Sequence, residues 1–151
     1  MYDDSARAVI RSWKERGLRG LAAVSADVVT EAIARPNAAA LVAVPSDHDR
    51  SLLRGEHPAD ALARELAGRW NIPVLAPIAR SGARARQARL PLAARRGNIR
   101  GAFAPTASVR GVVCLVDDVY TSGETVNAAA SALRKAGAHR IDVVCLARAV
   151  R

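Results

Sequence analysis

Residues Gly111–Gly137 read GVVCLVDDVYTSGETVNAAASALRKAG, and this stretch decides the predicted fold. It opens with Val112–Val116, an unbroken apolar run rich in β-branched side chains, which is typical of a strand buried on both faces. Asp117 and Asp118 follow directly, and a short polar turn leads into an alanine-rich helix. Gly137 has the character of the glycine that ends such a helix. The predicted order is strand, acidic pair, hydroxyl-rich loop and helix.

The loop between the acidic pair and the helix has the composition of an anion site. A loop that feeds a helix N-terminus directs free N–H groups outward, where the helix dipole favours an anion. The residues predicted to bind a phosphate there are Thr121, Ser122, Gly123, Glu124 and Thr125. Asp117 and Asp118 would stand beside them, at the carboxyl end of the strand. Because carboxylates repel phosphate, we expect this pair to hold sugar hydroxyls or Mg²⁺, and the ligand class is a sugar phosphate.

The string LVDDVYTSGET, residues 115–125, resembles the 5-phosphoribosyl-1-pyrophosphate (PRPP) motif of type I phosphoribosyltransferases. That motif joins apolar residues, two acids, two variable positions and Thr-[Thr/Ser/Ala]-Gly-x-Thr. Glu124 is a departure, which suits the first turn of a helix but adds negative charge near the phosphate site. Phosphoacceptor receiver domains also contain apolar-acidic strings, but near the chain start and without this turn. A plain buried strand before a capped helix does not account for the adjacent acids.

Length and composition predict one domain over residues 1–151. The net charge of +9, mostly from arginine, indicates anionic ligands or nucleic acid, although a general bias toward Ala and Arg explains it equally well. The two cysteines, Cys114 and Cys145, lie in separate apolar runs, which argues against a zinc site or a disulfide framework. With no signal peptide or membrane-spanning run in view, we expect a cytoplasmic protein without a membrane contact.

The remaining pattern alternates helices and strands, which predicts an α/β fold with a central, mainly parallel sheet flanked by helices. Met1–Arg35 reads as helical, with a break near Ser25–Asp27 between two apolar faces. Gly17 and Gly20 interrupt the region, so two short helices are expected as much as one. Its expected apolar positions are Ile10, Trp13, Leu18, Leu21 and Val24 on one face and Val28, Val29 and Ile33 on another. Further strands are expected at Ala38–Val44, within Ile72–Ile78 and at Ile141–Leu146, with a helix at Pro58–Trp70.

A second resemblance comes from the arginine-rich segment. Arg80, Gln87-Ala88-Arg89-Leu90 and Arg96–Phe103 are similar to the R…Q-x-x-L…R-x-N-[VI]-x-G-A-F signature of the ComF family, which are competence-associated phosphoribosyltransferase-like proteins. Val44–Ser46, Arg54-Gly55 and Ile141–Ala149 also match, so the similarity covers most of the chain. It implies a basic lid, or hood, at about residues 79–103 that closes on an anionic substrate.

The resemblance also assigns residues on the two sides of the expected pocket. The residues expected to meet pyrophosphate are Ser46, Arg50 and Arg54. The lid or acceptor residues are Arg80, Gln87, Arg96, Asn98 and Phe103. Arginine suits this task because its guanidinium grips phosphate oxygens in a bidentate manner.

Two departures from the ComF pattern affect the expectations. The family often begins with a four-cysteine zinc module, and this sequence has no such motif, which puts any DNA or partner contact of that module in doubt. Many members continue Arg-Gly-aromatic-Asn-Gln, whereas this chain reads Arg54-Gly55-Glu56-His57-Pro58. For His57 we favour a role at the helix entry, because Pro58 is well suited to the first helical position.

The resemblance implies Mg²⁺-dependent transfer of a phosphoribosyl group from PRPP to a nitrogen acceptor, with release of pyrophosphate. Asp117 and Asp118 would be the catalytic pair that orients the ribose, and Mg²⁺ would be held mainly through PRPP. Nothing in the sequence names the acceptor or decides for or against a homodimer.

Two alternatives remain open. One is a PRPP- or nucleic-acid-associated protein of DNA uptake without transferase activity. The scarcity of aromatic residues, 3%, argues against base stacking but leaves weak charge-driven contact with nucleic acid. The other is a degenerate member of the fold that binds phosphate weakly.

Overall fold

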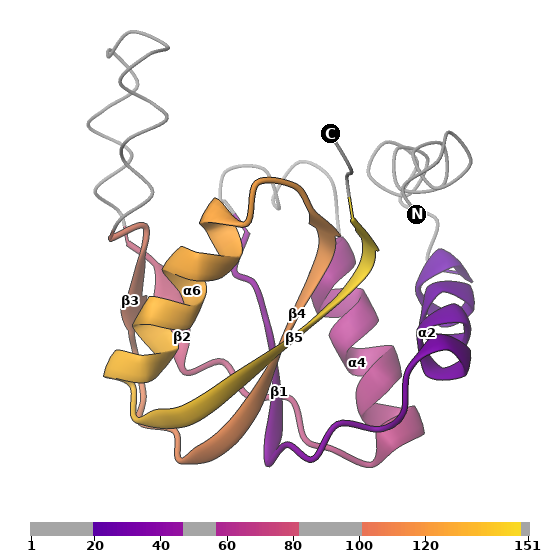
Figure 1. Cartoon of the computed structure of the whole chain (residues 1–151), viewed down its shortest axis with the longest axis horizontal. Helices are drawn as coiled ribbons and strands as arrows, with labels where there is room; N and C mark the ends of the chain where they lie inside the picture. Colours follow the sequence, from indigo (N-terminus) through magenta and orange to yellow (C-terminus); the bar gives the residue numbers. More distant parts are fainter. Residues whose placement is uncertain (1–19, 47–56, 82–100, 149–151) are drawn as a thin grey trace, which may run out of the picture.

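The computed structural model describes residues 20–46, 57–81 and 101–148. Its elements in chain order are α2 (Gly20–Ala32), β1 (Ala40–Ala43), α4 (Pro58–Trp70), β2 (Ile78–Arg80), β3 (Phe103–Pro105), β4 (Gly111–Tyr120), α6 (Glu124–Lys135) and β5 (Ala138–Arg148). Figure 1 shows a central sheet with helices on both faces, which confirms the predicted α/β class. In the described part of the chain, no helix is long and apolar enough to cross a membrane.

The main sheet is parallel and has the order β1-β4-β5. A single parallel bridge between Leu41 and Val74 adds a short segment on the outer side of β1. There the Leu41 N–H donates to the Pro73 carbonyl at 2.8 Å, and the Leu75 N–H donates to the Leu41 carbonyl at 2.9 Å. The strand expected within Ile72–Ile78 is thus reduced to this bridge, as prolines that lack an N–H limit further pairing.

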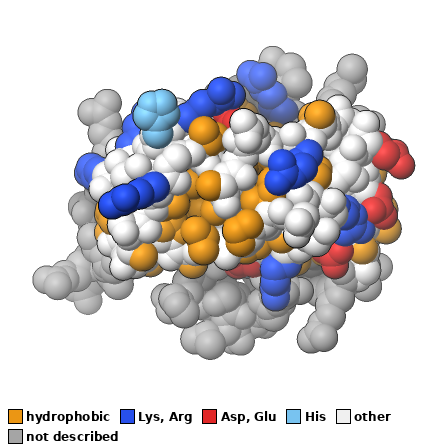
Figure 2. Space-filling model, turned by 90° about the horizontal axis from the view of Figure 1, so that it is seen from below, with side chains coloured by type: hydrophobic (Ala, Val, Ile, Leu, Met, Phe, Trp, Pro, Cys, Tyr) orange, Lys and Arg blue, Asp and Glu red, His pale blue; other side chains and the backbone are white. Residues whose placement is uncertain are grey.

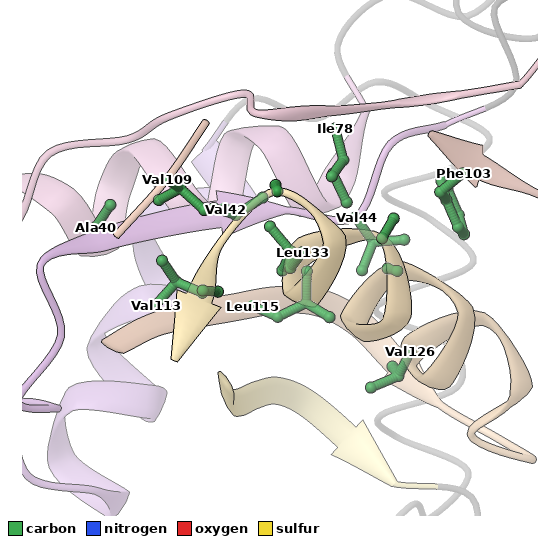
Figure 3. Packing of buried hydrophobic residues seen from close by; sticks show 14 residues of the cluster. Ala40, Val42, Val44, Ile78, Phe103, Val109, Val113, Leu115, Val126 and Leu133 are labelled. Carbon is green, nitrogen blue, oxygen red and sulfur yellow. The ribbon is translucent and has the colours of Figure 1, made fainter. Parts of the chain in front are cut away.

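Side chains of the central strands alternate between two apolar layers. Leu41, Cys114 and Val116 pack with α2 and α4 on one face. On the other face, Val113 and Leu115 pack with α6 (Figure 3). Val113–Val116 are 0% exposed, so the prediction of a strand buried on both faces is confirmed.

Helix α2 differs from its prediction in two respects. It runs without a break through Ser25 and Ala26, and both side chains are buried against the core. Val24 and Val28, expected on apolar faces, are 59% and 52% exposed, and Ile33 beyond the helix is 41% exposed. The reason is that α2 faces α4 with Ala22, Ala26 and Val29, so Val24 and Val28 point away, and Val29 is buried as predicted. The earlier part of the predicted helical region lies outside the described residues.

Helix α4 has the predicted bounds, and its ends explain them. His57 is the N-cap residue with an extended backbone, and Pro58 occupies the first helical turn, as expected for a helix entry. At the other end, Asn71 adopts the left-handed conformation with φ of 51°, which closes the helix. The predicted end of α6 is also confirmed, since the helix stops at Lys135 and Gly137 has φ of +107°.

The connections place a topological switch point between β1 and β4. From β1 the chain passes through α4 to the Val74 bridge on one side, and from β4 it passes through α6 to β5 on the other. The helices α4 and α6 accordingly cover opposite faces of the sheet (Figure 1). Ligands of open parallel sheets bind where the carboxyl ends of such diverging strands meet.

The opposite end of the sheet has a different surface. Seen from below, hydrophobic side chains gather near the centre of the face, with Lys and Arg side chains around them (Figure 2). The large apolar side chains exposed in the described residues include Val74 and Leu75, at 38% and 44%.

Candidate functional site

The acidic pair lies near the end of β4, inside the strand rather than after it. Asp117 and Asp118 are only 8% and 6% exposed. The strand continues because β4 stays paired with β5, with Asp117 opposite Cys145. The Oδ1 of Asp117 accepts the Asp118 N–H at 2.9 Å, and the Oδ1 of Asp118 accepts the Val119 N–H at 2.9 Å. Both carboxylates are thus anchored to their own backbone.

The two carboxylates are not equivalent, because neighbouring side chains of a strand point to opposite faces. Continuing the alternation of β4, Asp117 follows Val113 and Leu115 on the α6 side, and Asp118 follows Val116 on the α4 side. This difference was missed in the sequence prediction, which placed the pair beyond the strand end.

The predicted phosphate loop, residues 121–125, joins β4 to α6. Thr121, Ser122 and Glu124 are exposed, and Thr125 is half-buried. Gly123 is buried and forms the N-cap of α6 with φ of 76° and ψ of −5°. Its carbonyl accepts the N–H of Asn127 at 2.8 Å, and a glycine has no side chain to cap the other first-turn donors. The loop therefore presents hydroxyls and helix N–H groups at the same edge of the sheet as the acids.

Gly123 is required by its neighbour as well as by its backbone angle. A Cβ atom at this position would overlap the Tyr120 hydroxyl and lie 2.8 Å from Cζ of the same ring. Positive φ is also unfavourable for other residues. The backbone angle thus favours glycine, and any side chain at this position would in addition have to displace the Tyr120 ring.

The chain after β1 approaches the acidic pair from the neighbouring strand. The Val44 N–H donates to the Val116 carbonyl at 2.9 Å, and half-buried Ser46 follows two residues later. Ser46 thus lies just beyond the carboxyl end of β1, the strand that pairs with β4 beside the acids. The other two residues predicted to meet pyrophosphate, Arg50 and Arg54, lie outside the described residues.

The ends of the predicted hood form a small sheet of their own. Strands β2 and β3 pair antiparallel, with Arg80 opposite Phe103. The Arg80 guanidinium lies 5.2 Å from the centroid of the Phe103 ring, and its Nε donates to the Pro45 carbonyl at 3.4 Å. The Phe103 ring is 6% exposed and packs in the α6 layer, so its faces are largely covered by the core. The other predicted hood residues, Gln87, Arg96 and Asn98, lie outside the described residues.

Two residues of the site were not found from the sequence. Tyr120 and Arg148 are partners in the β4–β5 register, and the Arg148 guanidinium lies 5.5 Å from the centroid of the Tyr120 ring. The register of two parallel strands depends on their packing, so the sequence carries no local signal for this pair. Burial raises the pKa of the nearby Cys145 thiol, which is therefore uncharged near neutral pH.

The donor set fits a magnesium ion only in part. In the ranges that the structure describes, no group of three or more His, Cys, Asp or Glu residues is placed to hold a metal. Mg²⁺ commonly uses one or two carboxylates together with water and substrate phosphates. Asp117 and Asp118 satisfy that more modest requirement.

Comparison with known proteins gives relatives in sequence and in structure. No family model matches the chain. It is 37% identical over 115 residues to competence protein F of Haemophilus influenzae, covering 73% of this chain and 50% of that protein. It is 34% identical over 113 residues to the DNA utilization protein YhgH of Salmonella typhimurium, covering 72% and 48%. The chain thus spans about half the length of the curated relatives it matches.

Among solved structures, the glutamine PRPP amidotransferase from B. subtilis matches with a TM-score of 0.55 and 19% identity, over 83% of this chain and 26% of that chain. The orotate phosphoribosyltransferase from Aeropyrum pernix matches with a TM-score of 0.52 and 17% identity, over 87% and 73%. At these identities the likeness concerns the fold.

Proposed function

We propose that this chain, which is related to competence protein F and has the type I phosphoribosyltransferase fold, binds PRPP and transfers its phosphoribosyl group to a nitrogen acceptor, releasing pyrophosphate. One observation carries the proposal. A buried acidic pair and a glycine-capped helix N-terminus lie together at the carboxyl end of β4, beside the switch point with β1. This is the arrangement that a sugar phosphate requires, with an anion site and a hydroxyl-binding site a few residues apart.

Each part of the site has a chemical role in this reaction. Residues 121–125 hold the 5′-phosphate through hydroxyls and backbone N–H groups, far from the bond that breaks. Asp117 and Asp118 accept hydrogen bonds from the ribose hydroxyls. Their negative charge also stabilises the positive charge that develops on the ribose as the anomeric bond breaks. When bound, Mg²⁺ supplies neutralisation of the pyrophosphate charge.

The pyrophosphate side is proposed to begin at Ser46. Its position at the end of β1 puts it across the switch point from the acids. Arg50 and Arg54 follow in the sequence and would provide bidentate contacts to the leaving group. The nitrogen acceptor and the homodimer both stay predictions.

Isothermal titration of PRPP with Mg²⁺ into the full chain tests the proposal. We expect binding by the natural sequence and loss of binding in the double variant Asp117→Asn/Asp118→Asn. Glu31→Gln is the control, because it makes the same kind of charge change at an exposed position of α2. Absence of PRPP binding by the natural sequence would refute the site. Binding that survives in the double variant would refute the role of the acids.

A second candidate function rests on the relatives and the charge. The chain carries a net charge of +9, and one relative is named for DNA utilization. Charge-driven contact with single-stranded DNA would weaken steeply as salt rises. Fluorescence anisotropy with a labelled oligonucleotide at low and physiological salt measures this, and DNA binding without PRPP binding would favour this function over transfer.

A further inference from the structure

We infer that Tyr120 and Arg148 act together as positioning residues for the phosphate loop, and that Arg148 strengthens the hold of this loop on a 5′-phosphate. The inference rests on the proposed function, because it concerns the same phosphate site. The two side chains come from neighbouring strands at the end of the sheet where the loop begins. Neither belongs to the glycine-and-threonine pattern that defines the loop.

The first step is the contact between Tyr120 and Gly123. The Tyr120 hydroxyl occupies the space where a side chain at Gly123 would begin. Tyr120 is half-buried, and it directly precedes the loop that its own ring supports. The ring therefore restricts where the N-cap of α6 sits, and with it the first-turn N–H groups of the helix. Preorganised donors bind an anion more tightly than donors that must be ordered on binding.

The second step is the contact between Arg148 and the Tyr120 ring. The guanidinium lies 5.5 Å from the ring centroid, within the range of a cation–π interaction. Arg148 is exposed, and the strand register puts it directly beside Tyr120. The guanidinium thus holds the ring in place, and the same ring contacts both Arg148 and the space beside Gly123.

The charge of Arg148 is needed because of Glu124. This carboxylate stands in the first turn of α6, next to Gly123, and it is exposed. A phosphate dianion bound at the loop meets this negative charge, and a cation on the neighbouring strand offsets the repulsion. The effect is local, since exposed charges are screened beyond roughly 10 Å at moderate ionic strength. Pyrophosphate, expected on the β1 side, should feel it much less.

Separate titrations of ribose 5-phosphate and of pyrophosphate with Mg²⁺ distinguish the two sides of the site. We expect Arg148→Ala to weaken ribose 5-phosphate binding about tenfold and pyrophosphate binding less than about twofold. Arg148→Lys should recover part of the loss, because it keeps the charge but has a less favourable stacking geometry. Arg140→Ala is the matched control, since Arg140 lies on the same strand and pairs with Asp142 at 2.8 Å. An equal loss for both ligands, or none, would overturn the inference.

A ligand-free measurement tests the Tyr120–Gly123 contact independently. The substitution Gly123→Ala is made both in the natural protein and in the Tyr120→Ala variant. In urea unfolding it should lower the free energy of unfolding more in the natural protein, because only that background contains the clashing Tyr120 hydroxyl. Equal effects in both backgrounds would overturn the contact and hence the inference. If the natural protein binds neither ligand, the proposed function fails together with the inference. If the natural protein and the Arg148→Ala variant bind ribose 5-phosphate equally tightly, the inference fails while the proposed function stands.

Discussion

Replacing Gly137 with alanine should destabilise the protein through one identifiable contact. Gly137 connects α6 to β5, and its N–H donates to the Arg134 carbonyl at 3.0 Å. With φ of +107°, an added Cβ atom would lie 2.7 Å from the backbone carbonyl oxygen of Val109. This oxygen cannot rotate away like a side chain, because the neighbouring Val109 N–H is held by the Ala136 carbonyl at 2.9 Å.

A second glycine, Gly111, separates the free-energy cost of the clash from the cost of positive φ. Gly111 also has positive φ, +79°, but an added Cβ meets nothing within 4 Å. Gly111→Ala should cost about 1–2 kcal/mol of backbone strain, reduced by about 0.4–1 kcal/mol because alanine restricts the unfolded chain. Gly137→Ala adds the carbonyl clash and a weakened hydrogen bond, together about 1–2 kcal/mol. The two variants should thus differ by about 1–2 kcal/mol.

Urea unfolding followed by far-ultraviolet circular dichroism measures both free energies of unfolding. We expect the midpoint to fall slightly for Gly111→Ala and clearly for Gly137→Ala, with similar slopes. For a protein of this size, the extra loss in Gly137→Ala corresponds to a Tm lower by roughly 2–8 °C than that of Gly111→Ala. Stabilities within about 0.5 kcal/mol of each other would refute the proposed clash.

Three further changes probe the core, the pH dependence and the surface. Leu115 is fully buried, and Leu115→Ala should lower the free energy of unfolding by about 2–5 kcal/mol. Val143 is 41% exposed, and Val143→Ala should lower it by less than about 1 kcal/mol. Urea unfolding midpoints of the two variants measure the difference. Burial raises the pKa of Cys114 to about 12 from 9.0. Because the unfolded chain then loses this proton at lower pH than the folded protein, the free energy of unfolding should fall as pH rises through that interval. Urea titrations at successive pH values should show this decline, and a smaller one for Cys114→Ala. Arg69 joins Asp27 of α2 at 2.8 Å and Glu65 of α4 at 2.6 Å, and Arg69→Ala should cost about 1 kcal/mol at low salt and less at high salt in thermal unfolding.

The elements predicted correctly from the sequence are those whose ends are determined by nearby residues. The bounds of α4 follow from Pro58 at its start, and the end of α6 follows from the glycine after it. In α2 the apolar positions were only partly predicted, because Val29 is buried as expected but Ala22, Ser25 and Ala26 take the other core positions instead of Val24 and Val28. Strand β5 extends beyond the expected Ile141–Leu146 because pairing with β4 continues past the apolar run.

For the candidate site, the motif predicted the order of parts but not their orientation. The order of acidic pair, glycine-containing turn and helix is as the motif indicated, but the acids are buried within β4 rather than placed after it. The opposite orientation of Asp117 and Asp118 depends on how far β4 continues, and the Tyr120–Arg148 contact depends on strand register. Both are set by pairing between distant segments, which residue patterns do not encode locally.

The division of the core by the sheet has a practical consequence for handling the protein. Helix α2 packs in the layer away from the phosphate loop, and Val28 on its outer side is 52% exposed. A cysteine introduced there would offer a reactive thiol, Cys114 is fully buried, and the partly exposed Cys145 would first be replaced by serine. The protein can therefore be attached to a sensor surface or carry a fluorophore through α2 while the carboxyl ends of the strands face the solution.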